Sequence, residues 1–480
     1  MTTLPALGVG AIFVPGLEPL LAAGNGLLDY VEIEPQTFWF GDRKGGGVGE
    51  RVEAVVAAAG VDHRPALVHG VGCPVGGSAP PPVDDLANLA AFADRVDAPW
   101  VSEHLSFTAV DDADGTDWTG LLLPPPQTAA GAEHVAGTIR DVRARLDRPF
   151  AFETGVNYLP ETPGDLADGV FWRRVAEAAD CGILLDLHNV WCNARNGRQP
   201  LDDLFDDLPL DRVWELHLAA GEQRDGVWLD AHDGLVDPEL LAIAADLVPR
   251  LPGLRAITFE IMPEYFHVGG FTTREVRGQL GRLHDLWDLR RPGVGRGARG
   301  GEQERRTRRI GADPPAGVHE RERERVLAAR VTDRPDAPAG DDGDDDERDR
   351  IAVMQDLVRA VRRGLAVSAL PLTLRLLRLE LGRDEVERLF RLHWAARPPQ
   401  QYADREGAEF ARTVQAEVGD RVAHLGSVVA WELAVIDQAR HGGSRTVDLT
   451  CEPLALLEPL GRGDHPGALP VAPHRVTVTP

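Results

Sequence analysis

Short apolar runs recur along the first two-thirds of the chain, and segments with helical periodicity separate them. The runs are rich in Val, Ile, Leu and Phe, as strands covered on both faces are. We expect strands near residues 8–13, 29–34, 65–69, 99–104, 149–154, 182–187, 212–218 and 256–261. The segments 84–96 and 128–146 place apolar side chains at three- and four-residue intervals, which is typical of amphipathic helices.

The alternation of strand and helix predicts the fold class. Repeated over residues 1–290, it matches the length of a (β/α)8 TIM barrel, an α/β fold. An open doubly wound sheet is the alternative, but that fold usually has fewer strands and a Gly-rich phosphate turn after the first one. Here the first run continues into IFVPG, and no GxGxxG motif follows it. We therefore predict a TIM barrel over residues 1–290.

The composition changes sharply after residue 290. The stretches RGARGGEQERRTRR, ERERERVLAAR and DDGDDDERDR are rich in charge and poor in apolar residues. Such a composition has little ability to fold alone, so we predict a charged flexible linker over residues 291–350. Contact between its Arg-rich half and RNA is the alternative, but the acidic half beside it favours a solvated tether.

Residues 351–480 form the second predicted domain, which is smaller and mainly α-helical. Stretches such as IAVMQDLVRAVRRGL, DEVERLFRLHWAA and VAHLGSVVAWELAVIDQAR carry apolar residues at three- and four-residue intervals. The sequence of this part contains no evident cluster of metal ligands and no nucleophile–base pair. We expect this domain to bind a partner rather than to do chemistry.

Composition and charge disfavour several classes of protein. The chain has 480 residues, of which 43% are hydrophobic, and its formal net charge is −25. A general nucleic-acid binder needs a surplus of Lys and Arg, so this balance disfavours one. The cysteines form no CxxC pair, the N-terminus lacks the pattern of a signal peptide, and no apolar run approaches the roughly 20 residues that span a bilayer. We expect a cytoplasmic protein without a membrane partner.

Polar side chains that can bind metals stand at or just after the ends of the predicted strands. In a parallel barrel these ends meet at one rim, so we expect the side chains to share a site. They are His69, Glu103, His104, Glu153, Asp186, His188, Asn189, His217, Asp230, His232 and Glu260. One metal ion needs about four to six donors, so the set predicts a multinuclear site. Mixed nitrogen and oxygen ligands suit divalent Fe, Mn, Zn or Co.

Each of these residues also has a structural interpretation. A single strand-end His is more often a hydrogen-bonded rim residue than a ligand, and a single Glu often pairs with Arg. The coincidence at six successive strands nevertheless favours metal binding, because unpaired buried carboxylates are costly. Glu103 is expected to support its neighbour His104, and Glu32 and Glu34 are expected to form ion pairs. For His188, ligation and hydrogen bonding are equal alternatives.

The motifs HGVG, SEHLSF, LLDLHNV, HLAAG and DAHD together resemble the multinuclear non-heme iron-dependent oxidases, a family that includes the methanobactin biosynthesis oxidase. The resemblance covers roughly residues 5–290. It implies a barrel that holds two or three iron ions and uses O2 as co-substrate to oxidise cysteine residues of a ribosomally synthesised precursor peptide. By position it implies as iron ligands His69, His104, Glu153, Asp186, Asn189, His217, Asp230, His232 and Glu260. Among them it assigns the catalytic roles to Glu153, Asp186 and His217, with Glu153 as a bridge.

The chain departs from the family at two positions. Many relatives read Glu-Asn after the fifth strand, whereas this chain reads Glu153-Thr154. It also has His188 where Asn is frequent. These departures leave the number of irons and the product open.

The C-terminal domain carries a second resemblance. Residues 382–414 and 425–440 resemble the helical partner proteins that are encoded beside these oxidases and help to present the precursor peptide. Fusion of such a partner to the enzyme raises its effective concentration without a new contact. The resemblance therefore implies a Cys-containing precursor peptide as the partner of this chain.

Three other functions compete with the oxidase. An endonuclease-like phosphodiesterase would use similar ligands, but it needs a basic groove, which the acidic balance disfavours. A sugar isomerase normally needs a Lys near its metals. Lys44 is the only lysine in residues 1–290, which disfavours an isomerase. A non-catalytic peptide- or metal-binding protein is the third alternative. The sequence does not indicate the oligomeric state.

Overall fold

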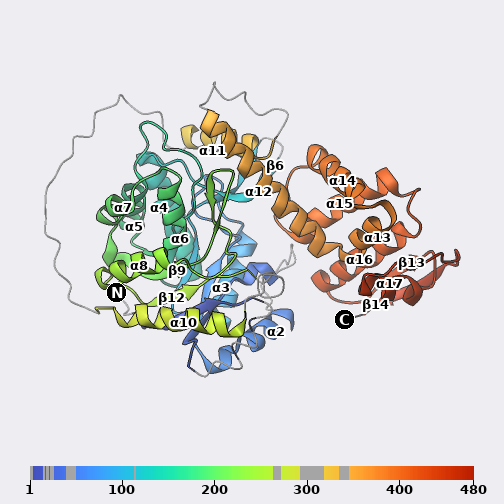
Figure 1. Cartoon of the computed structure of the whole chain (residues 1–480), viewed down its shortest axis with the longest axis horizontal. Coiled ribbons are helices and arrows are strands. Elements are labelled where there is room, and N and C mark those ends of the chain that lie inside the picture. Colours follow the sequence, from blue (N-terminus) through green and yellow to red (C-terminus); the bar gives the residue numbers. More distant parts are fainter. Residues whose placement is uncertain are drawn as a thin grey trace.

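The computed structural model describes residues 4–14, 17, 21, 26–38, 50–112, 115–262, 272–291, 318–333 and 345–479. Its first part is a closed barrel of parallel strands in the order β1-β12-β9-β8-β7-β4-β3-β2 (Figure 1). The strands are β1 (Gly8–Ile12), β2 (Tyr30–Ile33), β3 (Ala66–Gly70), β4 (Val101–His104), β7 (Phe150–Glu153), β8 (Gly182–Asp186), β9 (Val213–Leu218) and β12 (Ala256–Phe259). The predicted TIM barrel is confirmed.

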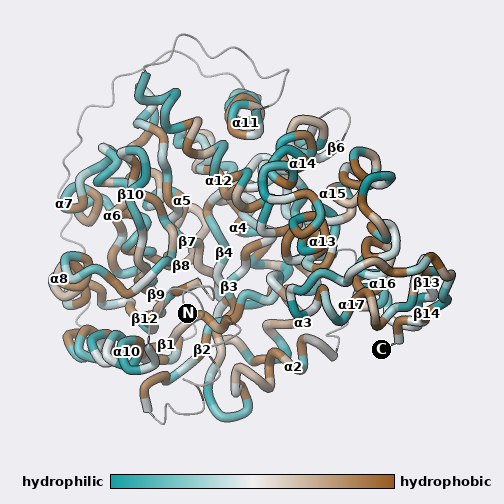
Figure 2. Tube along the Cα trace, turned by 45° about the vertical axis from the view of Figure 1, so that its right-hand side comes forward, coloured by the Kyte–Doolittle hydropathy of each residue, from teal (hydrophilic) through white to brown (hydrophobic). Residues whose placement is uncertain are grey.

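Helices cover the outside of the barrel. They include α2 (Glu50–Ala59), α3 (Val83–Arg95), α4 (Ala129–Leu146), α5 (Asp168–Ala179), α6 (Leu187–Arg195), α7 (Leu201–Asp207), α8 (Pro238–Leu247) and α10 (Thr273–Asp288). Hydrophobic and hydrophilic positions alternate along them (Figure 2). The apolar faces, such as Val135, Ile139 and Val142 of α4, pack against the strands in one continuous core. Helix α4 begins where the Thr128 hydroxyl accepts the Gly131 N–H at 2.8 Å.

The interior of the barrel changes from apolar to polar along its axis. One end is filled by side chains that are each 0% exposed, namely Tyr30, Leu67, Trp100 and Ala256. Because side chains alternate between the two faces of a strand, the next inward positions lie two residues further on. Those positions are Glu32, His69, Ser102 and Thr258. Along the barrel axis, an apolar plug is therefore followed by a polar layer, and the polar layer is followed by the rim that carries the candidate ligands.

Two hairpins extend the loops of this rim. Strands β5 (Phe107–Asp112) and β6 (Gly115–Leu123) pair antiparallel directly after β4. Strands β10 (Glu222–Arg224) and β11 (Val227–Leu229) pair in the loop after β9. The apolar runs of the sequence did not predict either hairpin.

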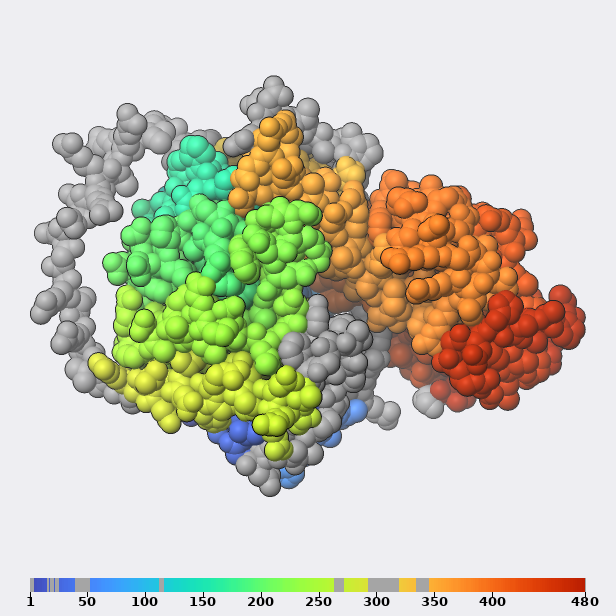
Figure 3. All heavy atoms as spheres, in the orientation of Figure 1, coloured from blue at the N-terminus to red at the C-terminus, as the bar shows by residue number. Residues whose placement is uncertain are grey.

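The C-terminal part is mainly helical, as expected, and has its own apolar core, which includes Leu377, Phe390 and Phe410. Its elements are α12 (Asp345–Ala369), α13 (Pro371–Leu381), α14 (Arg383–Ala396), α15 (Ala403–Val418), α16 (Leu425–His441), α17 (Pro453–Arg462) and the paired strands β13 (Arg445–Leu449) and β14 (His474–Val478). Figure 3 shows this helical unit, in orange to red, beside the barrel, and Figure 1 shows α12 reaching from the barrel to the unit. Among the described helices, none combines the length and apolar character that crossing a bilayer requires.

The expected flexible linker needs a correction. Within residues 291–350, helix α11 (Val318–Val331) and the first residues of α12 are helical. Ala328 and Val331 of α11 are buried against the barrel hairpin, where Phe107 and Val110 belong to the same apolar cluster. Packing of this kind stabilises a helix that is too charged to be stable alone. Residues 292–317 and 334–344 lie outside the described residues, and the domain boundaries at 290 and 350 stay a prediction.

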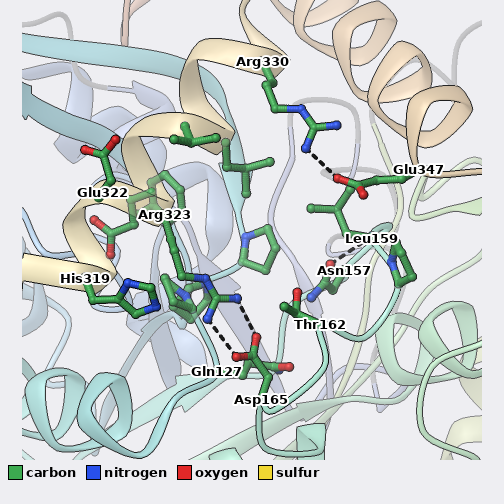
Figure 4. A pocket seen from close by; sticks show the side chains of 18 of the residues that line it. Gln127, Asn157, Leu159, Thr162, Asp165, His319, Glu322, Arg323, Arg330 and Glu347 are labelled. Carbon is green, nitrogen blue, oxygen red and sulfur yellow. Dashed lines mark hydrogen bonds and ion pairs between the residues drawn. The ribbon is translucent and has the colours of Figure 1, made fainter. Parts of the chain in front are cut away.

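Polar contacts also dock α11 on the barrel. Both oxygens of Glu324 accept the Ser78 N–H at 3.0 Å, and Arg323 donates two hydrogen bonds to Asp165 at 2.8 and 2.6 Å. A cavity of about 290 Å³ remains between α11 and the loops that follow β6 and β7. The pairs Arg323–Asp165 and Arg330–Glu347 close two of its sides (Figure 4).

The helical unit touches the barrel through the loop between α14 and α15. Gln401 donates from Nε2 to the carbonyl oxygen of Gly72 at 3.3 Å, and the Tyr402 hydroxyl donates to Asp85 Oδ2 at 3.0 Å. Gly72 lies in the loop that follows β3. The unit that sequence analysis assigned to partner binding therefore contacts a loop at the rim of the barrel.

Candidate metal centre

The first group of candidate ligands comes from three adjacent strands. His69, His104 and Glu153 stand at the ends of β3, β4 and β7. Both imidazoles direct Nε2 at the same carboxylate oxygen: Glu153 Oε2 lies 3.1 Å from His69 and 3.0 Å from His104. That oxygen is buried and has no hydrogen-bond partner among the described residues. Convergence of donor atoms without hydrogen bonds is the arrangement that ligands of a shared cation adopt.

Neighbouring groups fix which nitrogen of each imidazole faces Glu153. His104 Nδ1 lies 3.0 Å from the carbonyl oxygen of Gly70, which only accepts, so Nδ1 carries a proton and Nε2 is the nitrogen that could bind a metal. His69 Nδ1 contacts the Ser102 hydroxyl at 2.8 Å. Glu103 accepts the His104 N–H at 2.9 Å, and so supports its neighbour through the backbone.

The second set of donors lies across the rim. His217 Nδ1 lies 2.8 Å from Glu260 Oε1, and His232 Nε2 lies 3.3 Å from Glu260 Oε2. Asp186 ends β8 and caps α6: its Oδ1 accepts the Asn189 N–H at 2.7 Å, while its Oδ2 is buried without a hydrogen-bond partner among the described residues. In Glu153–Asp186–His217 and in Asp186–His232–Glu260, donor atoms lie within 4.8 Å of one another.

Asp230 joins this set through two imidazoles. Its Oδ1 lies 2.8 Å from His232 Nε2 and 3.0 Å from His188 Nδ1. The contact of His188 is thus a hydrogen bond to a candidate ligand. His232 has a φ of 49°, a left-handed conformation that L residues other than glycine rarely adopt. The loop that carries Asp230 and His232 therefore has a strained backbone conformation at His232, beside the other donor residues.

Asn189 presents an amide oxygen to the same region. Its Nδ2 donates to the carbonyl oxygen of Thr154 at 3.3 Å, which leaves Oδ1 buried without a hydrogen-bond partner among the described residues. The Thr154 hydroxyl in turn accepts the Asp186 N–H at 3.0 Å. The Thr154 side chain thus positions Asp186, while the backbone carbonyl of the same residue positions Asn189.

Crowding of buried carboxylates shifts the pKa values of the site in opposite directions. Burial and the charges of Glu260 and Asp230 raise the pKa of Asp186 well above its usual value. Burial opposes the ionised form of Glu260 as well, but His217 and His232 outweigh it and lower the pKa of Glu260 to about 2. Burial likewise opposes the charged form of His104, yet the Glu153 carboxylate raises the pKa of His104 to about 10. A divalent cation would relieve the repulsion among these carboxylates.

Several buried donor atoms at the rim have no hydrogen-bond partner among the described residues. They are Glu153 Oε2, Asp186 Oδ2, Asn189 Oδ1, His217 Nδ1, His232 Nε2 and Glu260 Oε2. Buried polar atoms are normally paired, because an unpaired one costs about 1–3 kcal/mol. The donors are nitrogen and oxygen atoms of the kinds that divalent transition metals accept. The residues present therefore fit a metal centre.

The structure brings together all the residues that the sequence predicted as ligands, and their role as ligands stays a prediction. Sequence reasoning missed the support that Glu32 and Glu215 give to His217. Glu32 forms the expected ion pair, 2.9 Å from His217 Nε2, and Glu215 lies 3.5 Å from the same atom. Burial raises the pKa of Glu34, which shares an inward face with Glu32. The two-residue spacing in VEIEP and VWELHL was the available signal.

The barrel and its rim define a class of TIM-barrel proteins that carry clustered His, Asp and Glu side chains that could hold metal ions. Residues 11–262 match the RiPP precursor modification enzyme family MbnB/TglH/ChrH. The chain belongs to this family, which implies a metal cofactor and a peptide substrate.

Relatives in other bacteria match the same part of the chain. A UPF0276 protein of Caulobacter vibrioides is 31% identical over 245 residues, which are 51% of this chain and 83% of the relative. A UPF0276 protein of Pseudomonas aeruginosa is 34% identical over 252 residues, which are 52% of this chain and 84% of the relative.

Among solved structures, a 3-keto-D-glucoside 4-epimerase from E. coli is 14% identical, with a TM-score of 0.36, and the match covers 58% of this chain and 99% of that one. A D-psicose 3-epimerase from Clostridium cellulolyticum is 13% identical, with a TM-score of 0.34, and the match covers 59% of this chain and 97% of that one.

Proposed function

We propose that this protein is a multinuclear iron-dependent oxidase that uses O2 to modify cysteine residues of a ribosomally synthesised precursor peptide. The observation that carries the proposal is the convergence of unpartnered, buried imidazole and carboxylate atoms at one barrel rim. Membership in a family of precursor-modifying enzymes supports a peptide as the substrate.

Three overlapping groups of side chains would hold the iron ions. His69, His104 and Glu153 form the first group, and Glu153 is shared with Asp186 and His217 in the second. The third group, Asp186, His232 and Glu260, shares Asp186 with the second, and Asp230 and Asn189 extend it. Shared carboxylates can bridge neighbouring ions, since each has two oxygens. Imidazole and carboxylate ligation suits ferrous iron, although affinity alone does not select it.

The exposure of the donors indicates the side from which a peptide would approach. The side chains of Asp186 and His217 are 0% exposed, whereas those of His104, Asp230 and His232 are 16%, 18% and 21% exposed. The deep residues would hold the ions and keep water away, and the outer ones would face the substrate. When bound, iron would lower the pKa of the substrate thiol and transfer electrons from the cysteine residue to O2.

Reconstitution with iron and a peptide tests the proposal. The protein is loaded with Fe(II) under anaerobic conditions, mixed with a Cys-containing peptide and exposed to O2. We expect the peptide to lose mass corresponding to hydrogens, whose electrons and protons pass to O2. An Asp186→Ala variant should leave the peptide unchanged. Cleavage of the peptide would indicate a hydrolase instead, and an unchanged peptide that stays bound would indicate a capture protein.

A further inference from the structure

We propose that Glu32 is a positioning residue that orients the His217 imidazole so that Nδ1 faces the metal centre. This inference rests on the proposed metal binding and adds a residue that is not itself a ligand. It starts from the two nitrogens of one ring: His217 Nδ1 lies 2.8 Å from Glu260 Oε1, while Nε2 lies 2.9 Å from Glu32 Oε2. One edge of the imidazole thus faces the candidate ligands, and the other edge faces into the barrel.

The contact between Glu32 and His217 crosses the interior of the barrel. Glu32 belongs to β2 and His217 to β9, and β1 and β12 stand between these strands in the barrel order. Both side chains are 0% exposed. A metal ion on Nδ1 would require the ring proton to sit on Nε2, because a neutral imidazole carries one proton. Glu32 Oε2 is the closest carboxylate oxygen to that nitrogen, so it is placed to accept the proton.

Glu32 is itself held by a buried polar layer. The Thr258 hydroxyl lies 3.0 Å from Glu32 Oε2 and 2.9 Å from Glu215 Oε1, and the Tyr30 hydroxyl lies 2.5 Å from Thr258 Oγ1. Trp100 donates from Nε1 to Glu215 Oε2 at 3.0 Å. All five side chains of this layer are fully buried. The layer includes Tyr30 and Trp100 of the apolar plug and holds the Glu32 carboxylate beside His217.

The same geometry argues against a further metal ion in this layer. Glu32, Glu215 and His217 also bring donor atoms within 4.8 Å of one another. However, the Trp100 N–H, which can only donate, and the Thr258 hydroxyl already occupy positions around these two carboxylates, and the Tyr30 hydroxyl contacts Thr258 in turn. Both oxygens of Glu215 have such partners. Glu32 Oε1 lacks a hydrogen-bond partner among the described residues, as one oxygen of each rim carboxylate does. The rim differs because Glu153 and Asp186 each belong to two groups of candidate ligands, whereas Glu32 and Glu215 belong to one. The layer is therefore a support, and the rim is the binding site.

Anaerobic titration with Co²⁺, followed by visible absorption, tests the role of Glu32. Loss of a carboxylate that supports a metal-bound His typically lowers metal affinity by about 10–100-fold. We expect Glu32→Leu to weaken one class of bound Co²⁺ by about this factor and to change its absorption bands. Glu32→Gln keeps an oxygen that can accept from Nε2, so it should restore most of the affinity. Thermal unfolding of the metal-free variants reports whether each one folds.

Glu215→Gln is the matched control, because Glu215 shares the layer but lies 3.5 Å from His217. We expect it to lose less affinity than Glu32→Leu and to keep the wild-type absorption bands. Unchanged Co²⁺ binding in Glu32→Leu would overturn the positioning role. A loss of about 10–100-fold in Glu32→Gln would also overturn it, because that variant keeps the acceptor and removes only the charge, and this measurement stands even if Glu32→Leu does not fold. Wild-type protein that binds no metal would instead contradict the proposed function.

Discussion

Asp186 and Asn189 are joined by a hydrogen bond that links the helix cap of α6 to the candidate metal centre. The Asn189 N–H donates to Asp186 Oδ1 at 2.7 Å, and the other Asp186 oxygen is left facing the rim without a hydrogen bond. One side chain thus starts the helix and offers a ligand atom. The position of Asp186 directly before α6 follows from this geometry, because an N-cap accepts from the N–H two or three residues later.

Substitutions at Asp186 can separate its two roles. Asp186→Asn keeps an oxygen that can cap α6 but removes the negative charge, whereas Asp186→Ala removes both. We expect both variants to lose bound iron and peptide oxidation. Only Asp186→Ala should also lose about 0.5–2 kcal/mol of stability from the missing cap. Metal analysis and denaturant unfolding of the metal-free proteins measure the two effects. Full iron occupancy in both variants would refute the ligand role.

Glu153→Ala is expected to affect more than one ion. Glu153 Oε2 lies beside both His69 and His104, and Glu153 also belongs to the group with Asp186 and His217. Removal of a shared carboxylate should therefore lower the iron content more than His69→Ala, which removes a ligand of the first group alone. Iron per protein, measured after the same anaerobic loading, gives the comparison. An equal iron content in the two variants would argue against a bridge.

Iron binding should become tighter as the pH rises. Burial disfavours the charged form of His104, but the charge of Glu153 outweighs it and raises the pKa of His104 in the metal-free protein to about 10. At neutral pH an iron ion must therefore displace a proton from Nε2, and this competition weakens as protons become scarce. We expect the apparent Fe(II) affinity to increase between about pH 6 and 9, with protons released on binding. His104→Gln should reduce this dependence, and a pH-independent affinity in the wild type would contradict the expectation.

Much of the site could be predicted because the position of a residue at the end of a strand can be read from a few neighbouring residues. The strand-end positions of His69, His104 and Glu153 follow from short apolar runs and the rule that parallel strands end at one rim. The role of Glu32 could not be predicted this way, because its contact with His217 spans the barrel and depends on closure of the sheet. The two-residue spacing of acidic and imidazole side chains along a strand also does not tell which of them support the site and which could bind a metal.

Helix α11 was missed for a related reason. Its sequence, VHERERERVLAARV, is so charged that composition indicates a solvated tether. Its stability comes from contacts with residues far away in the chain, such as Ser78 and Asp165. Such contacts become visible only once the barrel loops are in place.

Docking of α11 can be tested through Glu324. Glu324 is 2% exposed and accepts the Ser78 N–H with both oxygens, so Glu324→Ala would leave a partly buried donor unpaired. We expect a loss of about 1–3 kcal/mol in the free energy of unfolding and faster proteolysis within α11. Glu322→Ala is the matched control, because Glu322 forms an exposed pair with Arg325 on the same helix. That variant should change stability by about 0.5 kcal/mol or less. Equal effects would show that α11 is not docked through Glu324.

The position of α12 decides where the chain can be shortened. The helix runs from Asp345 to Ala369, and its residues Ile351, Met354 and Val358 share an apolar cluster with Phe107 of the barrel hairpin. A chain that ends at residue 350 would expose this cluster, so we expect it to aggregate or to unfold at a lower temperature than the full chain. A chain that ends at residue 369 keeps α12 packed over this cluster. It should retain iron while losing affinity for the peptide. Thermal unfolding, iron content and peptide binding distinguish these outcomes. If both shortened chains matched the full chain in stability, α12 would not be part of the barrel's packing.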